Sequence, residues 1–312
     1  MRSAAPFPSL GLPRSARPRS SASCSPPLPP SSASRPWARA MAPRCDHCQE
    51  TNMNLDFRPH DAHVHLERTA SGSTNAAELV AVMDAAGVET AAAVVPQPMG
   101  SDNSPVFEAL AEFPGRFVAI LKLDVFVGTV VGTVAELLDR GARGVRFTIF
   151  DDADVAWLAD GTVAPLLEVL ADRATSLTFH CRPDQLRAVG RVAADHPDLT
   201  VFVDHLGRPD VASGPDTDQF NAFLDLARHP NILAKTPDSA FFSAVAAPHL
   251  DLVPFLERAL DSFGSERVLW GSDWPVAEYK TSMQPVLTVL EGASAAERRA
   301  VLRGNFERVF GG

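Results

Sequence analysis

The sequence predicts an α/β protein whose main domain, residues 56–312, is a single (β/α)8 barrel, the fold also called a TIM barrel. The chain has 312 residues, 46% of them apolar, and such a barrel takes about 250 residues as one domain. From Phe57 onward, eight short apolar segments alternate with segments of helical pattern. The first carries His63-Val64-His65 and the last ends at Asp273, and a barrel brings both strand ends to one rim.

The eight strand candidates are rich in Val, Ile, Leu and Phe, which is typical of parallel strands buried on both faces. They are 57–65, 89–95, 117–124, 144–149, 176–180, 199–205, 231–236 and 267–273. Helices are expected between them, for example over 75–86, 130–140, 162–173, 183–195, 217–228 and 249–263. No Gly-x-Gly-x-x-Gly motif opens a helix after the first strand, so a nucleotide-binding sheet has no specific support.

Residues 1–55 differ in composition from the rest of the chain. They are rich in Ser, Pro, Ala and Arg, with seven arginines against Asp46 and Glu50. They show no strand or helix period, so we expect a disordered extension. The alternatives for its origin are an organellar transit peptide, a flexible arm, and translated upstream sequence with Met41 or Met53 as the natural start, and we favour the last.

Charge and cysteine usage exclude several classes of protein. The chain carries a net charge of −10 and residues 1–55 carry +5, so residues 56–312 carry −15, which does not suit nucleic-acid binding. No apolar run approaches the roughly 20 residues that span a membrane, and we expect a cytoplasmic protein, or an organellar one if a transit peptide is present. Cys24, Cys45, Cys48 and Cys181 do not form a disulfide framework, and the lone Cys-x-x-Cys lacks the second pair of a zinc finger.

Chemically active side chains gather at the predicted carboxyl ends of the strands, where the active site of such a barrel forms. His63 and His65 share a face because side chains two apart on a strand point the same way. The other groups expected at this rim are His180, His205, Asp273, Lys122, Arg146, Arg182, Arg208, Asp102 and Asn103. Four histidines and an aspartate at one rim indicate a site rather than four separate structural histidines.

The motifs at these strand ends resemble those of the amidohydrolase superfamily (amidohydrolase-related family 2). The closer resemblance is to its lactone-hydrolysing branch, which includes 2-pyrone-4,6-dicarboxylate lactonase, sulfomuconolactonase and fuconolactonase. It covers about residues 57–310 and rests on Gly100-Ser101-Asp102-Asn103-Ser104, Val203-Asp204-His205-Leu206-Gly207-Arg208-Pro209 and Leu269-Trp270-Gly271-Ser272-Asp273-Trp274-Pro275. The chain departs from the branch at Leu66-Glu67-Arg68-Thr69 and at Lys235-Thr236-Pro237-Asp238, where we expect substrate specificity to be set.

This resemblance implies hydrolytic opening of a lactone by a water molecule that Asp273 activates as general base. His63, His65 and His180 would stabilise the oxyanion, directly or through a metal. Strand 144–149 lacks the lysine that two-metal members carboxylate, so a binuclear centre is not expected. One divalent ion, zinc first, held by His63, His65, His180 and Asp273, and hydrolysis without a metal both stay open. For His205, ligation of a metal, contact with the substrate and contact with a ligating residue all stay open.

Four cations at the rim predict binding of a carboxylated or sulfonated small molecule, because guanidinium groups grip such anions. They are Lys122, Arg146, Arg182 and Arg208, and the alternative is ordinary ion pairing with Asp124, Asp204 or Asp210. Asp102 and Asn103 either line the pocket or form a turn. The alternative functions are sugar-acid lactone hydrolysis, metal-dependent decarboxylation or hydration, and a barrel without catalytic activity. Neither nucleic acid nor membrane is an expected partner, and a homo-oligomer is compatible with the sequence.

Overall fold

A computed structural model describes residues 55–311, apart from 97–99, 127, 153 and 154. The extension predicted over residues 1–55, with its Cys-x-x-Cys motif, lies outside the described residues except for Leu55. Among the described helices, none is long and apolar enough to cross a membrane.

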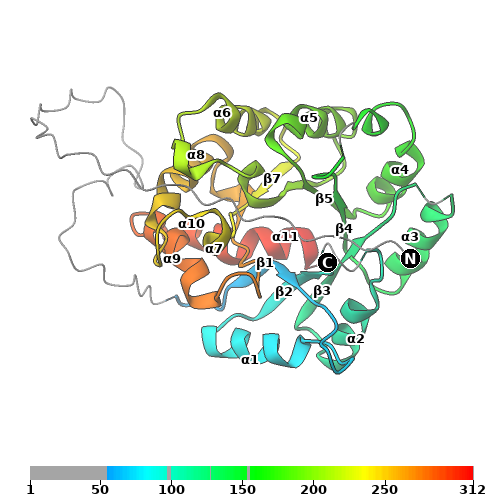
Figure 1. Ribbon diagram of the computed structural model, residues 1–312, viewed down its shortest axis with the longest axis horizontal. Coiled ribbons are helices and arrows are strands. Elements are labelled where there is room, and N and C mark those ends of the chain that lie inside the picture. Colours follow the sequence, from blue (N-terminus) through cyan, green and yellow to red (C-terminus); the bar gives the residue numbers. More distant parts are fainter. Residues whose placement is uncertain (1–54, 97–99, 127, 153–154, 312) are drawn as a thin grey trace, which may run out of the picture. The chain divides into compact units, whose positions relative to one another are not determined.

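Eight parallel strands form one sheet in the order of the sequence, with helices on its outside (Figure 1). The strands are β1 His60–His65, β2 Thr90–Val94, β3 Phe117–Lys122, β4 Gly144–Thr148, β5 Ser176–His180, β6 Val201–Val203, β7 Ile232–Lys235 and β8 Val268–Leu269. Backbone hydrogen bonds then join the segment after β8 to β1, since Ala62 N donates to Trp270 O at 2.9 Å and His65 N donates to Trp274 O at 2.8 Å. The predicted (β/α)8 barrel is confirmed.

The helices occupy the outer layer, where their apolar faces cover the strands. They are α1 Ala76–Ala86, α2 Ser104–Glu112, α3 Val130–Asp139, α4 Ala164–Asp172, α5 Leu186–Asp195, α6 Asp218–Leu224, α7 Ser239–Phe242, α8 Val253–Phe263, α9 Tyr279–Val289, α10 Ala295–Arg299 and α11 Asn305–Phe310. Gly87 ends α1 in the left-handed conformation (φ 72°) that the C-cap position favours.

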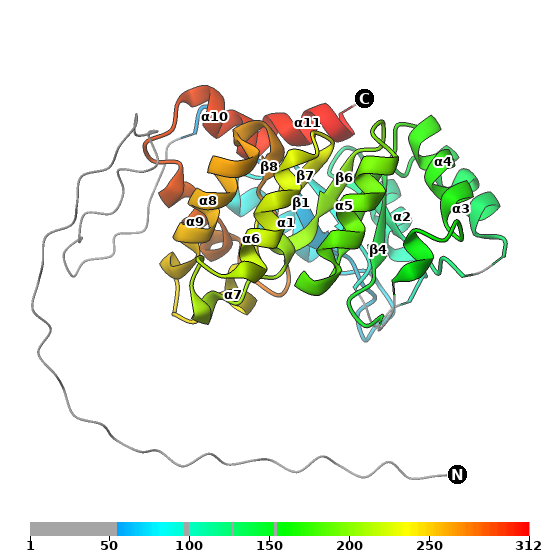
Figure 2. The same cartoon turned by 90° about the horizontal axis from the view of Figure 1, so that it is seen from above.

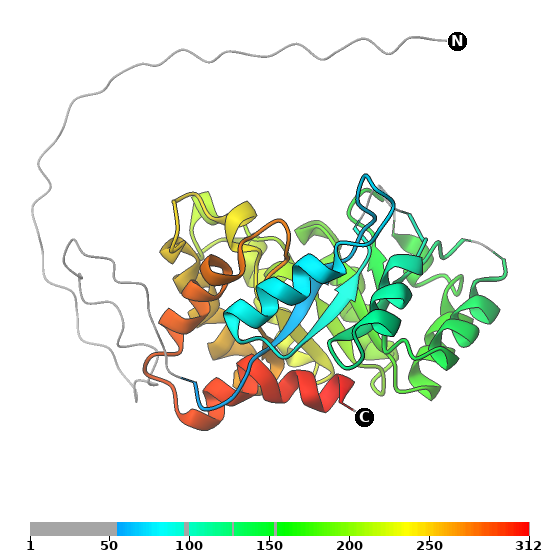
Figure 3. The same cartoon turned by 90° about the horizontal axis from the view of Figure 1, so that it is seen from below.

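Helix α11 lies across the amino ends of the strands (Figures 2 and 3). Phe306 and Phe310 pack into the barrel against small and apolar side chains such as Ala62 and Phe202. His60, at the start of β1, stacks on Phe306 with ring centroids 4.8 Å apart. Helix α11 therefore fills the barrel interior at the amino ends of the strands.

Seven of the eight strands are shorter than the sequence predicted, and β6 and β8 differ most from their predicted ranges. β6 ends at Val203, because His205, Leu206, Gly207 and Arg208 all have positive φ values between 50° and 70° and form a left-handed turn. β8 ends at Leu269, and Asp273 also has a positive φ of 59°. A left-handed residue other than glycine costs about 1–2 kcal/mol. Such strain is typical of sites whose surroundings fix an unfavourable backbone conformation.

Candidate active site

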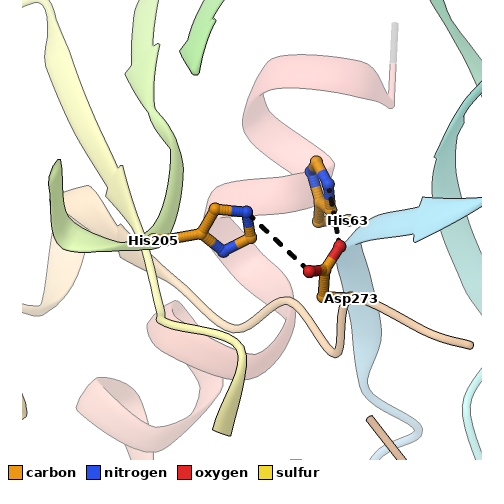
Figure 4. Close-up of side chains that lie close together, drawn as sticks. All are labelled: His63, His205 and Asp273. Atoms are coloured by element: carbon orange, nitrogen blue, oxygen red, sulfur yellow. Dashed lines mark ion pairs between the residues drawn. The ribbon is translucent and has the colours of Figure 1, made fainter. Parts of the chain in front are cut away.

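The carboxylate of Asp273 lies among three histidine side chains at the carboxyl end of the barrel. Its Oδ1 is 2.9 Å from His65 Nε2 and 3.2 Å from His63 Nε2, and its Oδ2 is 3.9 Å from His205 Nε2. Figure 4 shows His63 and His205 as neighbours that both approach the Asp273 carboxylate, and their ring centroids are 5.2 Å apart. The backbone fixes this arrangement, since Asp273 N donates to His63 O at 2.9 Å.

Asp61 ties the two segments that carry these groups. Its buried Oδ1 accepts from the backbone N–H of His63 at 2.9 Å and of Ser272 at 3.0 Å. Ser272 directly precedes Asp273, so one carboxylate sets the relative position of β1 and the segment after β8. Burial raises the pKa of Asp61 to about 6.

Burial keeps three imidazoles at this rim, those of His63, His180 and His205, neutral at pH 7 by lowering their pKa values. Burial lowers the pKa of His63 to about 3 and the pKa of His180 to about 2, and it also lowers the pKa of His205. Burial opposes ionisation of Asp273, but His205 and contacts from His63 and His65 hold the pKa of Asp273 well below its usual range. The site therefore presents an ionised Asp273 carboxylate beside the neutral imidazoles of His63 and His205, which can donate hydrogen bonds or ligate a metal.

One divalent ion fits this donor set. Ligand atoms of His63, His205 and Asp273 all lie within 4.8 Å of one another. The buried atoms His63 Nε2 and Asp273 Oδ1 also lack a hydrogen-bond partner of good geometry among the described residues. Two nitrogen ligands and a carboxylate suit zinc, and His65 is adjacent as a further ligand.

His180 does not take the position that the sequence suggested for it. Arg208 Nη1 lies 3.0 Å from His180 Nε2 and is the donor, because a guanidinium has no acceptor. The His180 ring stacks on Phe150 with centroids 5.6 Å apart, and it meets His205 edge-on at 5.9 Å. The geometry thus favours His205 over His180 as the third imidazole around Asp273.

Two of the four predicted rim cations, Arg146 and Arg182, form ion pairs with carboxylates of the protein. Arg146 Nε lies 2.8 Å from Asp204 Oδ2 in a fully buried pair. Arg182 donates to the carbonyls of Phe150 and Asp152 and pairs with Asp184 at 3.0 Å. Arg146 thus forms one of the ion pairs considered as the alternative to substrate binding, whereas the partner of Arg182, Asp184, was not among those considered.

The other two cations lie in different surroundings. Arg208 packs over Phe150, with 4.4 Å from its guanidinium carbon to the ring centroid, and over Phe242 at 5.2 Å. No carboxylate pairs with Arg208 among the described residues. Lys122 is 6% exposed at the end of β3, and its Nζ donates to Pro96 O at 3.3 Å.

Asp102 and Asn103 build a turn. Asp102 is exposed and accepts from Ser104 N at 3.0 Å. The Asn103 side chain accepts from Lys122 N at 2.8 Å and donates to Lys122 O at 2.9 Å. Asp102 and Asn103 therefore form a turn, and the Asn103 side chain holds the backbone of β3 at Lys122.

Sequence reasoning did not assign a role to Asp238, which lies beside Asp273. Asp238 is 1% exposed and accepts from Ala240 N and Phe241 N, which caps α7. Burial and the charge of Asp273 raise the pKa of Asp238 to about 7. The one available signal was the unusual Lys235-Thr236-Pro237-Asp238 sequence after β7.

Comparison with known proteins agrees with this geometry. The amidohydrolase family model matches residues 61–312. A 4-sulfomuconolactone hydrolase from Hydrogenophaga intermedia is 30% identical over 243 residues, which cover 75% of this chain and 78% of that protein. An L-fucono-1,5-lactonase from Burkholderia ambifaria is 33% identical over 142 residues, 45% of this chain and 48% of that protein.

The crystal structure of an amidohydrolase from Burkholderia multivorans with bound HEPES is similar with a TM-score of 0.71. It is 25% identical to this chain, and the alignment covers 81% of this chain and 99% of that one. The family match spans the whole barrel and includes all the strand-end groups described above. The chain belongs to the amidohydrolase family and is a hydrolase.

Proposed function

We propose that this protein hydrolyses a lactone ring and that Asp273 activates the attacking water. The observation that carries this proposal is the ionised Asp273 carboxylate, 2.9–3.9 Å from three imidazoles at the open end of the barrel. The relatives at about 30% identity include hydrolases of a sulfonated lactone and of a sugar lactone. Both reactions need the same two elements, a base for water and a group that polarises the ring carbonyl.

In the proposed reaction, Asp273 takes a proton from water while the water oxygen bonds to the lactone carbonyl carbon. The imidazoles of His63, His65 and His205 donate hydrogen bonds toward the oxygen on which negative charge develops. The ring carbon–oxygen bond then breaks, and Asp273 returns its proton to the departing ring oxygen. The product is an open-chain hydroxy acid.

His63, His205 and Asp273, with His65 beside them, would hold a divalent ion. Such an ion, when bound, polarises the carbonyl and lowers the pKa of water. In this arrangement, Asp204 keeps its contact with His63, because Asp204 Oδ1 lies 3.6 Å from Nδ1 while Nε2 faces Asp273. The neighbouring carboxylate would orient the ring and raise its basicity as a ligand.

We further propose an anionic lactone as substrate. The support is Arg208, whose guanidinium is held by aromatic rings at the mouth and has no carboxylate partner among the described residues. A guanidinium positioned in this way is suited to a carboxylate or sulfonate.

The test is Asp273→Asn in the full-length chain, assayed by acid release from a carboxylated lactone, a sulfonated lactone and a sugar lactone. We expect wild-type turnover of at least one anionic lactone and a loss of about 10²–10⁴-fold in kcat for the variant, the usual contribution of a general base. Mass spectrometry of the product separates addition of water from loss of carbon dioxide. Decarboxylation by the wild type, or full activity of the variant, would reject the proposal.

Zinc titration tests the ligand set separately from activity. We expect the wild type to bind one zinc ion per chain in calorimetry, and His205→Ala to weaken binding by at least tenfold. His180→Ala is the matched control and should bind zinc as the wild type does, because His180 faces Arg208. The opposite ranking of the two variants would restore His180 as the ligand.

A further inference from the structure

Large apolar side chains are exposed on the segments that follow β7 and β8, the strands nearest to Asp273. Five large hydrophobic side chains are exposed among the described residues, and four of them lie on these segments: Phe241, Val245, Leu250 and Val276. Phe241 is 62% exposed, and Val276 N donates to Asp273 O at 2.9 Å. A group of exposed apolar side chains, unlike scattered single ones, indicates a binding surface.

The segment Lys235-Thr236-Pro237-Asp238, which departs from the lactonase branch, leads into this surface. The carboxylate oxygen Oδ1 of Asp238 accepts from Ala240 N at 2.9 Å and from Phe241 N at 3.2 Å, and so caps α7. Helix α7 lies at the carboxyl end of the barrel, opposite α11 (Figure 2). The cap therefore fixes a short helix that carries Phe241 and Phe242 at the same end of the barrel as Asp273.

The two phenylalanines are continuous with the groups around Asp273. The ring centroids of Phe242 and His205 are 5.7 Å apart, and His205 Nε2 lies 3.9 Å from Asp273 Oδ2. Phe241 meets Phe242 at 5.0 Å between ring centroids, with the planes at 75°. An arm on a lactone ring held at Asp273 can therefore pass along Phe242 and reach the exposed ring of Phe241.

Arg208 holds this aromatic wall in place. Its guanidinium carbon lies 5.3 Å from the ring centroid of Phe241 and 5.2 Å from that of Phe242, and its Nη1 donates to His180 Nε2 at 3.0 Å. A cation over aromatic rings is an attractive contact. A wall that is ordered before binding takes up an apolar group with little further loss of side-chain entropy.

We infer that Phe241 and Phe242 form a subsite for an apolar, aromatic arm of the substrate. This inference rests on the proposed lactone hydrolysis and narrows its substrate to lactone rings that bear such an arm. A hydroxylated arm suits the wall less well, because hydroxyl groups lose water there without gaining strong hydrogen bonds from the rings. Phe241 is a specificity-determining residue in this assignment, and Asp273 remains the group that performs the chemistry.

Three lactones with the same ring and the same carboxylate test the arm: paraconic acid and its γ-phenyl and γ-hydroxymethyl derivatives. For the wild-type full-length chain, we expect KM for the γ-phenyl compound to be about tenfold below that of the other two, with similar kcat. Phe241→Ser should reduce this preference to less than about twofold, because the exposed ring is lost. Phe126→Ser is the matched control and should keep the preference, since Phe126 is also 62% exposed but follows β3.

Binding of unreactive acids tests the subsite without turnover. In calorimetry, trans-2-phenylcyclopentane-1-carboxylate should bind the wild type and Phe126→Ser about tenfold more tightly than cyclopentanecarboxylate does. Phe241→Ser should remove this difference, and Phe242→Leu should reduce it if Phe241→Ser does not fold. Equal affinity of the wild type for the two acids, or an unchanged difference in Phe241→Ser, would overturn the subsite. If the wild type opens none of the three lactones, lactone hydrolysis fails while this titration still decides the subsite.

Sedimentation velocity distinguishes a substrate arm from a second copy of the chain as the group that covers Phe241. We expect the wild type and Phe241→Ser to sediment alike at the concentrations used for kinetics. A wild-type dimer that Phe241→Ser dissociates would overturn the proposal, because the exposed ring would then belong to an interface between copies.

Discussion

Substitution of Asp204 by Asn should destabilise the barrel by about 3–5 kcal/mol, the usual loss when one partner of a buried ion pair is removed. The side chain of Asp204 is fully buried, and its carboxylate lies 2.8 Å from Arg146 Nε and 3.1 Å from Lys235 Nζ, which are 3% and 2% exposed. Asparagine keeps the size of the side chain but leaves two buried cations without a carboxylate ion-pair partner among the described residues. We therefore expect a value toward the upper end of that range.

A surface pair provides the matched control. Arg173 Nη1 and Asp139 Oδ1 are only 2.6 Å apart, but the two side chains are 45% and 67% exposed. Water and salt screen such a pair, so Asp139→Asn should cost at most about 1 kcal/mol. Distance alone would rank the two pairs the other way, and burial is the physical difference that the comparison isolates.

Thermal and urea unfolding, followed by tryptophan fluorescence and circular dichroism, measure the two losses. For a domain of this size, about 1 kcal/mol shifts the melting temperature by 2–4 °C, so Asp204→Asn should melt roughly 6–20 °C below the wild type. In 1 M NaCl the effect of Asp139→Asn should vanish and that of Asp204→Asn should persist. Similar losses for the two variants would refute the argument that burial makes the Asp204 cluster strong.

Two further predictions concern single side chains. Asp238 has a pKa of about 7 in the folded protein against an ordinary value of 3.8, so the folded state holds a proton that the unfolded state releases between pH 4 and 7. Wild-type stability should therefore fall with rising pH across that window, by up to about 1.4 kcal/mol per pH unit, relative to Asp238→Asn, and parallel urea-derived curves would contradict this. A Cβ on Gly144 would lie 2.6 Å from Ser176 Oγ, so Gly144→Ala should cost about 1–3 kcal/mol in urea unfolding. Gly132→Ala, in exposed α3 with nothing within 4 Å, should instead gain about 0.5–1 kcal/mol, and a loss there would show that free space is a poor guide.

Strand and helix periodicity predicted the barrel because buried parallel strands and their covering helices leave a repeating apolar pattern. The pattern could not predict where β6 and β8 end. The chain after Val203 stays buried through Asp204, His205 and Leu206, so burial does not mark the point where the backbone turns left-handed. Only Gly207 signalled a change of conformation, and glycine alone does not locate a turn of four residues.

The choice among the four rim histidines depended on information that strand positions do not contain. A strand end fixes the rim that a side chain reaches, but the direction of the ring depends on its neighbours. His205 turns toward Asp273 because its own φ is 54°. His180 faces Arg208, which lies three residues further along the same left-handed turn. One local conformation thus decides the positions of both rings.

Strand positions also could not predict the charge that the rim presents, because that charge depends on which cations pair with other groups of the protein. Counting cations along the sequence gives a strongly basic rim, but pairing removes Arg146 and Arg182 from it. Asp204 neutralises Arg146 inside the barrel, and backbone carbonyls of the loop after β4 hold the Arg182 side chain. Arg208, on the segment after β6, packs over aromatic rings, and Lys122 ends β3 with its Nζ donating to Pro96 O. A count of cations along the sequence therefore does not give the charge that the rim offers to a substrate.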